Sequence, residues 1–152
     1  MAANTGRSNA KWIQVFLDTP SSLTELTAYT KSVNTIGVTS ETQDVTAYSD
    51  AVKNVTIGRA DAPIAIKFNF DTALYAYLLA IKAAPTTPLS LNIEFGVNHA
   101  WYTGEPTFGI TSSTTSGYLM TGMSLDWDNQ EINCDFAVYG PTAPSFGTTA
   151  FT

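Results

Sequence analysis

Four oxygen-bearing side chains crowd into one short polar stretch of the sequence, at Asp126, Asp128, Asn129 and Glu131. Carboxylate and amide oxygens at such close spacing are ligands that Ca²⁺ accepts. The stretch lacks the glycine and the distal bidentate glutamate of a calcium-binding loop. The same residue types also stabilise tight turns, because Asp and Asn side chains accept hydrogen bonds from the backbone. We therefore expect a β-turn here and predict no metal site.

Residues that act as nucleophiles or general bases are scarce in this chain. It has one histidine, His99, and one cysteine, Cys134. Cys134 falls on the apolar side of an alternating segment, where a thiol behaves as a small buried hydrophobe and is unreactive. The sequence contains no Gly-x-Ser-x-Gly motif and no glycine-rich phosphate loop. These observations predict no enzyme activity and no cofactor.

The charged residues divide the sequence into two unlike parts. All seven Lys and Arg lie at or before Lys82, together with seven acids, so this part is formally neutral. Without clustered bases the chain has no groove for phosphates, and we predict no sequence-specific nucleic-acid binding. Acids that are exposed together would instead repel a polyanion. The six charged residues after Lys82 are all acidic and carry the net charge of −6: Glu94, Glu105, Asp126, Asp128, Glu131 and Asp135.

Length and composition favour a single domain over residues 1–152, with a flexible arm at residues 1–11 and a tail at residues 141–152. Charged residues make up 13% of the chain, about half of the usual share of roughly 25%. Thr and Ser largely replace them, and such a surface is easily covered by neighbouring subunits. The first ten residues are polar and residues 73–84 are too few to span a bilayer, so we expect no secretory signal and no membrane partner.

Alternating apolar residues indicate a mainly β fold of the sandwich or barrel type. In the clearest case Ile64, Ile66, Phe68 and Phe70 share one face of a strand. A hairpin that turns at residues 128–130 is expected near the end of the chain. The segments expected to form strands are residues 12–17, 29–35, 38–48, 64–70, 89–95, 107–110, 118–127 and 131–139.

One flanking α-helix is expected, at about residues 71–84. Asp71 is a good N-cap residue, Lys82 suits the last turn, and Pro85 ends the helix. Between them, four apolar residues form one stripe at helical spacing: Leu74, Tyr77, Leu78 and Ile81.

Two further segments were assigned from local signals. Residues 22–25 have the pattern of a capping box and predict a short helical turn. Residues 50–60 are mixed and charged and predict a loop, longer than a usual hairpin connection and therefore a candidate binding segment.

Two short motifs stand in an informative order. The first is Asp44-Val45-Thr46 followed by Tyr48-Ser49-Asp50, and the second is Phe68-Asn69-Phe70-Asp71, which leads into the helix. A strand pair follows, ending in Gly122-Met123-Ser124-Leu125 and in Cys134-Asp135-Phe136-Ala137-Val138-Tyr139-Gly140. Over residues 23–140 this order resembles the major tail tube proteins of long-tailed bacteriophages. The sequence departs from that family at Ser49, where a glycine is common.

The resemblance implies a β-sandwich or barrel with one flanking helix. It also implies a virion protein made in the host cytoplasm, whose partners are further copies of itself and other virion proteins. Its copies would form hexameric rings that stack into a hollow conduit for DNA. The loop at residues 50–60 matches the position that joins neighbouring rings, which makes Asp50, Lys53 and Arg59 candidate inter-subunit residues. Facing the conduit, we expect the acids Asp126, Asp128, Glu131 and Asp135.

Two other functions are compatible with the same residues. Similar sandwiches serve as capsid decoration or cement proteins, which bind the outside of a phage shell. A third interpretation is a ligand- or sugar-binding sandwich that uses aromatic side chains as stacking platforms: Trp101, Tyr102, Trp127 and Tyr139.

Overall fold

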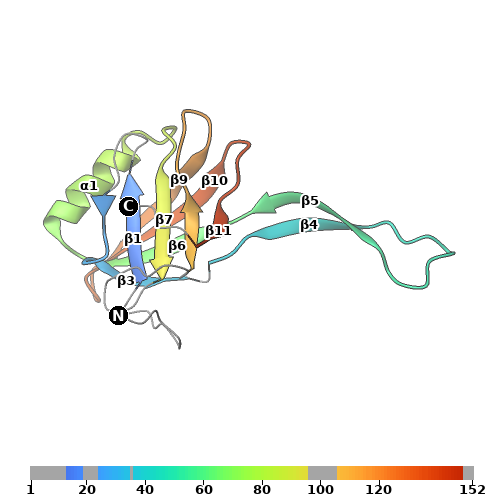
Figure 1. Cartoon of the computed structure of the whole chain (residues 1–152). Helices are drawn as coiled ribbons and strands as arrows, with labels where there is room; N and C mark the ends of the chain where they lie inside the picture. Colours follow the sequence, from blue (N-terminus) through green and yellow to red (C-terminus); the bar gives the residue numbers. More distant parts are fainter. Residues whose placement is uncertain (1–12, 19–23, 35, 96–105, 149–152) are drawn as a thin grey trace, which may run out of the picture.

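The computed structural model describes residues 13–18, 24–34, 36–95 and 106–148, and it shows two β-sheets packed face to face with a projecting hairpin (Figure 1). The neighbouring strands that are described all pair in antiparallel fashion. The five-stranded sheet has the order β11-β8-β7-β1-β2, and its strands are β1 (Ile13–Asp18), β2 (Thr24–Glu25), β7 (Ser90–Phe95), β8 (Thr107–Ile110) and β11 (Ser145–Gly147). The four-stranded sheet has the order β3-β6-β10-β9, and its strands are β3 (Thr30–Val33), β6 (Ile64–Asn69), β10 (Glu131–Tyr139) and β9 (Gly117–Asp126).

The hydrophobic core lies between these two sheets. On β6, Ile64, Ile66 and Phe68 are buried while Lys67 and Asn69 are exposed, which confirms the predicted alternation for these residues. The prediction is wrong for Phe70, which follows the strand and is exposed. Each fully buried side chain of this size stabilises the fold by about 1.5–3 kcal/mol. The inward-facing side chains of the other strands complete the core: Val15, Leu17, Leu91, Ile93, Phe108, Ile132, Cys134 and Phe136.

The helix α1 (Thr72–Lys82) covers one end of the sandwich (Figure 1). The predicted N-cap is confirmed, because the Asp71 side chain accepts hydrogen bonds from the backbone N–H of Ala73 and Leu74. The apolar stripe also faces the core, with Leu74, Leu78 and Ile81 buried. Its fourth member, Tyr77, donates a hydrogen bond from its hydroxyl to the Leu17 carbonyl oxygen at 2.7 Å, which ties the helix to β1. The mainly β class with one short helix is thus confirmed in the described residues.

The strands β4 (Thr39–Asp44) and β5 (Val55–Asp61) form a separate two-stranded hairpin that extends away from the sandwich (Figure 1). Every residue of both strands is exposed. Residues 45–54, which join the two strands, form the hairpin tip. Because an isolated two-stranded hairpin is marginally stable in water, this element is expected to gain order from a partner.

The structure corrects three of the local predictions. The helical turn predicted at residues 22–25 is wrong, because Thr24 and Glu25 pair with β1 as strand β2. The loop predicted at residues 50–60 is also wrong in its extent, because residues 55–61 form β5 and only residues 45–54 join the strands. The predicted C-terminal tail did not include β11, which pairs with β8 along residues 145–147. The predicted arm at residues 1–11 lies outside the described residues.

Candidate functional site

The outward face of the four-stranded sheet carries most of the polar residues of interest. The pairing register places Glu131 beside Asn69 and Asp126, and it places Asp135 beside Ala65. Directly paired residues lie on the same face of a sheet, so three of the four predicted acids share the face that points away from the core. The fourth, Asp128, lies in the turn at the end of that sheet.

Glu131 is not a free surface acid. Its side chain is only 5% exposed and forms ion pairs with Lys31 on β3 and with Lys67 on β6, the second at 3.6 Å between Nζ and Oε2. One carboxylate therefore connects three neighbouring strands and is balanced by two ammonium groups. These two bases come from the part of the chain before residue 83, which is formally neutral, and Glu131 comes from the acidic part. Folding therefore brings bases next to an acid that the sequence keeps apart from them.

The substitution Glu131→Gln is expected to lower the free energy of unfolding by about 1–2 kcal/mol, because the charge-assisted hydrogen bonds of Glu131 are lost. The loss is not larger, because the two lysines are half-exposed and solvent screens their charges. Urea unfolding monitored by circular dichroism measures it. Asp135→Asn is the matched control: Asp135 is exposed on the same face of β10, so its change is expected within about 0.5 kcal/mol. Equal effects of the two substitutions would contradict this role of Glu131.

Asp126 stabilises the turn between β9 and β10. Its Oδ1 atom accepts hydrogen bonds from the backbone N–H groups of Asp128 and Asn129, each at 3.2 Å, and its Oδ2 atom accepts from the Asn129 side chain at 2.9 Å. These hydrogen bonds, above all that from the Asn129 side chain, hold the pKa of Asp126 below its usual value. The turn predicted from these residue types is confirmed. No group of three or more metal-ligating side chains is found among the residues that the structure describes.

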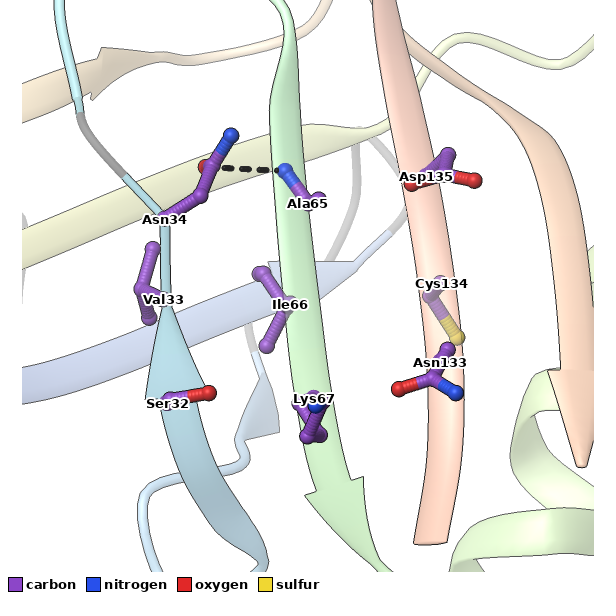
Figure 2. A pocket seen from close by; sticks show the side chains of 9 residues that line it. All are labelled: Ser32, Val33, Asn34, Ala65, Ile66, Lys67, Asn133, Cys134 and Asp135. Atoms are coloured by element: carbon purple, nitrogen blue, oxygen red, sulfur yellow. Dashed lines mark hydrogen bonds between the residues drawn. The ribbon is translucent and has the colours of Figure 1, made fainter. Parts of the chain in front are cut away.

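A shallow hollow of about 260 Å³ opens where β3 ends against β6. Figure 2 shows the residues that line it, from Ser32 to Asn34 on the β3 side and from Asn133 to Asp135 on β10. The Asn34 Oδ1 atom accepts a hydrogen bond from the Ala65 backbone N–H at 2.9 Å and so extends the pairing of β3 with β6. At about 260 Å³ the hollow is smaller than the roughly 300–1,000 Å³ of most ligand sites, and we assign no ligand to it.

Cys134 is buried next to this hollow, and burial raises the pKa of its thiol to about 12. The thiolate is the reactive form, and the raised pKa keeps the Cys134 thiol protonated at pH 8. We expect no reaction with Ellman's reagent in the native protein and one equivalent in concentrated guanidinium chloride. Rapid labelling of the native protein would contradict the burial of this thiol.

The three predicted inter-subunit residues are divided between the two ends of the hairpin. Asp50 is at the tip, where its Oδ2 atom accepts from the Ala47 backbone N–H and from the Asn54 side chain, and these bonds lower its pKa. Lys53 is also at the tip, 3.9 Å from the Asp44 carboxylate. Arg59 is on β5 near the base of the hairpin, beside Glu41 and Asp61. The structure thus brings Asp50 and Lys53 together and keeps Arg59 apart.

The aromatic platform is not assembled by the described residues. Trp127 precedes β10 and Tyr139 ends it, so the length of that strand separates them. Trp101, Tyr102 and His99 lie outside the described residues. The sequence did not reveal that the Trp127 ring lies beside the Phe70 ring, tilted, with 6.3 Å between the ring centroids. No helix in the described ranges is long and apolar enough to cross a membrane.

Comparison with known proteins finds similarity in structure alone. A scan against protein-family models gives no match, and a search of curated proteins gives none. A chain from the cryo-EM structure of the 6-fold symmetrised baseplate of the anti-feeding prophage (AFP) matches with a TM-score of 0.58 and 10% identity, over 97% of each chain. A chain from the virion of the native gene transfer agent (GTA) particle has a TM-score of 0.58 and 15% identity, over 93% of this chain and 99% of that one.

A third similar chain comes from the tail of the empty GTA particle, which was computed with helical refinement and C6 symmetry. It matches with a TM-score of 0.60 and 15% identity, over 93% of this chain and 99% of that one. These matches extend over nearly the full length of both partners. They establish a shared fold.

Proposed function

We propose that this chain is a structural virion protein, a tail tube subunit that assembles into rings and stacks them into a hollow conduit for DNA. The observation that carries the proposal is a fold shared over nearly the full chain with chains of 6-fold symmetric tail and baseplate particles. The projecting hairpin supports it, because an exposed ribbon of this length is suited to contact a neighbour. The role is mechanical, and the protein is made in the host cytoplasm and acts in the virion.

Lateral assembly has a physical basis in the four-stranded sheet. In the described residues β3 pairs with β6 only, and β9 pairs with β10 only, apart from Tyr118 at its start, which also bridges to Leu89. An open edge presents unpaired backbone N–H and C=O groups, which a strand from a neighbour can satisfy. Cyclic symmetry joins the β3 edge of one copy to the β9 edge of the next until the ring closes. Hexameric rings are the closed form that the matched particles support.

In such a ring the outward face of the four-stranded sheet lines the channel. It carries Asp126, Asp135 and the neutralised Glu131, while Asp128 lies at the rim. The exposed acids on this face repel the phosphate backbone, and its two lysines, Lys31 and Lys67, are paired with Glu131. The channel is therefore mildly acidic, and DNA passes through it without being bound.

Sedimentation velocity and native mass spectrometry of the purified protein test the assembly. The expected species is a closed hexamer, together with larger particles whose masses are multiples of it. A monomer at all concentrations, or a trimer that binds the outside of capsid shells, would instead support a decoration protein.

A further inference from the structure

An exposed aromatic patch lies at the end of the sandwich next to the start of α1. Its exposed members are Trp127, 71% exposed, and Phe70, 37% exposed, and they lie beside Tyr75 and Leu125, which are partly buried against the core. The Phe70 ring lies 5.9 Å from Tyr75 and 6.3 Å from Trp127 between centroids. Large apolar side chains that remain in water at one place mark a contact surface.

A hollow of about 240 Å³ is part of this patch. Phe70, Leu125 and Trp127 line it together with Asp126, Gln130 and Glu131. Small-molecule sites usually enclose about 300–1,000 Å³. The hollow is therefore suited to one or two side chains of a partner protein.

The aromatic patch and the hairpin lie at opposite ends of the same sheet. β6 begins at Ile64, three residues after β5 ends, and it finishes at Asn69, directly before Phe70. Figure 1 shows the same relation, with α1 at one end of the molecule and the β4–β5 hairpin at the other. Two different surfaces at opposite ends are what a head-to-tail contact between copies requires.

The hairpin tip has matching chemistry. Tyr48 is fully exposed, and Val45 and Val52 are largely exposed. The tip carries one base, Lys53, and one acid, Asp50, whose carboxylate is held by hydrogen bonds within the tip. Asp126 and Glu131 line the hollow in the patch, and Asp128, the residue after Trp127 in the turn, is exposed. Lys53, whose ion pair with Asp44 is exposed and long at 3.9 Å, is the basic group of the tip and complements these acids.

We infer that the aromatic patch receives the hairpin tip of a second copy of this chain in the adjacent ring, with Tyr48 or Val52 in the hollow and Lys53 beside Asp128. The inference rests on the proposed function and names the receptor of the hairpin. Aromatic side chains that become desolvated at the centre of an interface dominate its binding energy. Trp127 and Tyr48 are therefore the anchors of the contact, and the Lys53–Asp128 pair sets its register.

A charge exchange tests the pairing directly. Lys53→Glu and Asp128→Lys are each expected to raise the protein concentration needed for tube growth at least about tenfold, equivalent to about 1.4 kcal/mol. The double variant is expected to return it to within about threefold of the wild-type value, since one interaction is restored. The control combines Lys53→Glu with Asp135→Lys, which has the same net charge as the double variant but places the new lysine away from the patch. It is expected to leave the concentration needed for tube growth as high as in Lys53→Glu alone.

Trp127→Ala tests the aromatic anchor, with Tyr139→Ala as the matched control at the other end of β10. The first is expected to stop stacking while hexamers persist, and the second to leave stacking unchanged. If wild-type protein gives no stacked rings, the proposed function is wrong. If wild-type rings stack but the exchange restores nothing and Trp127→Ala stacks normally, the patch is not the receptor and the proposed function stands.

Discussion

Rings without tubes are the expected product when the hairpin tip, residues 45–54, is replaced by Asn-Gly. Asp44 and Val55 face each other at the ends of β4 and β5, and a two-residue turn of this type closes such a pair without strain. The shortened hairpin retains its strands but no longer reaches a neighbouring ring. Each tip provides a contact of about 2 kcal/mol or more, and its loss is repeated around the ring, so stacking disappears.

Negative-stain electron microscopy and sedimentation measure the result. A variant that keeps the length of the tip but replaces residues 45–54 with Gly and Ser is the control for side-chain contacts. This variant is also expected to form rings without tubes. Its hairpin is still long enough to reach the neighbouring ring, but the apolar and charged side chains that make the contact are gone. Tubes of normal length from the shortened protein would exclude the hairpin as the connector between rings.

The second large effect concerns the charge of the channel. Three of the four predicted acids have other roles: Asp126 holds its turn, Glu131 bridges two lysines, and Asp128 borders the aromatic patch. Asp135 is the one of these four acids that has no such role, and Ser124 is exposed on the same face of the sheet. Asp135→Lys with Ser124→Lys changes each copy by +3. We expect this variant to form tubes that retain double-stranded DNA at low salt, while wild-type tubes do not.

Retention is expected to fall steeply with salt, because every phosphate neutralised adds about −0.9 to the slope of log affinity against log salt. Fluorescence anisotropy of labelled DNA between low and physiological salt measures that slope. Glu25→Lys with Ala76→Lys supplies the same +3 on β2 and α1, away from the sheet. Equal DNA retention by this control would contradict a channel lined by β10 and β9.

Helices and strands that are marked by a clear residue pattern could be predicted from the sequence. The helix has an N-cap at Asp71 and an apolar stripe at helical spacing, and both are confirmed. β6 is likewise marked by alternation between Ile64 and Phe68. β5 was missed because Gly58, Arg59 and Asp61 give it the composition of a charged loop, and its exposed residues lack the alternation of a half-buried strand. β2 and β11 are too short to show any period, and only their pairing partners reveal them.

The candidate site was predictable in its residues but not in its electrostatics. The sequence placed Glu131 in an acidic hairpin, and the register confirms its position beside Asp126. Its partner Lys31 is 100 residues away in the chain, and no local pattern indicates such a pair. The aromatic patch was missed for the same reason, because Phe70 and Trp127 come from separate elements and meet only after folding.

The most direct test of the tail tube account is a cryo-EM reconstruction of the assembled particle. We expect stacked six-fold rings around an open channel, with the outward face of β3, β6, β10 and β9 lining it and each hairpin reaching into the next ring. Asp135 would then point into the channel. Solid filaments, knobs on a capsid shell, or rings with this sheet on the outer surface would contradict the account.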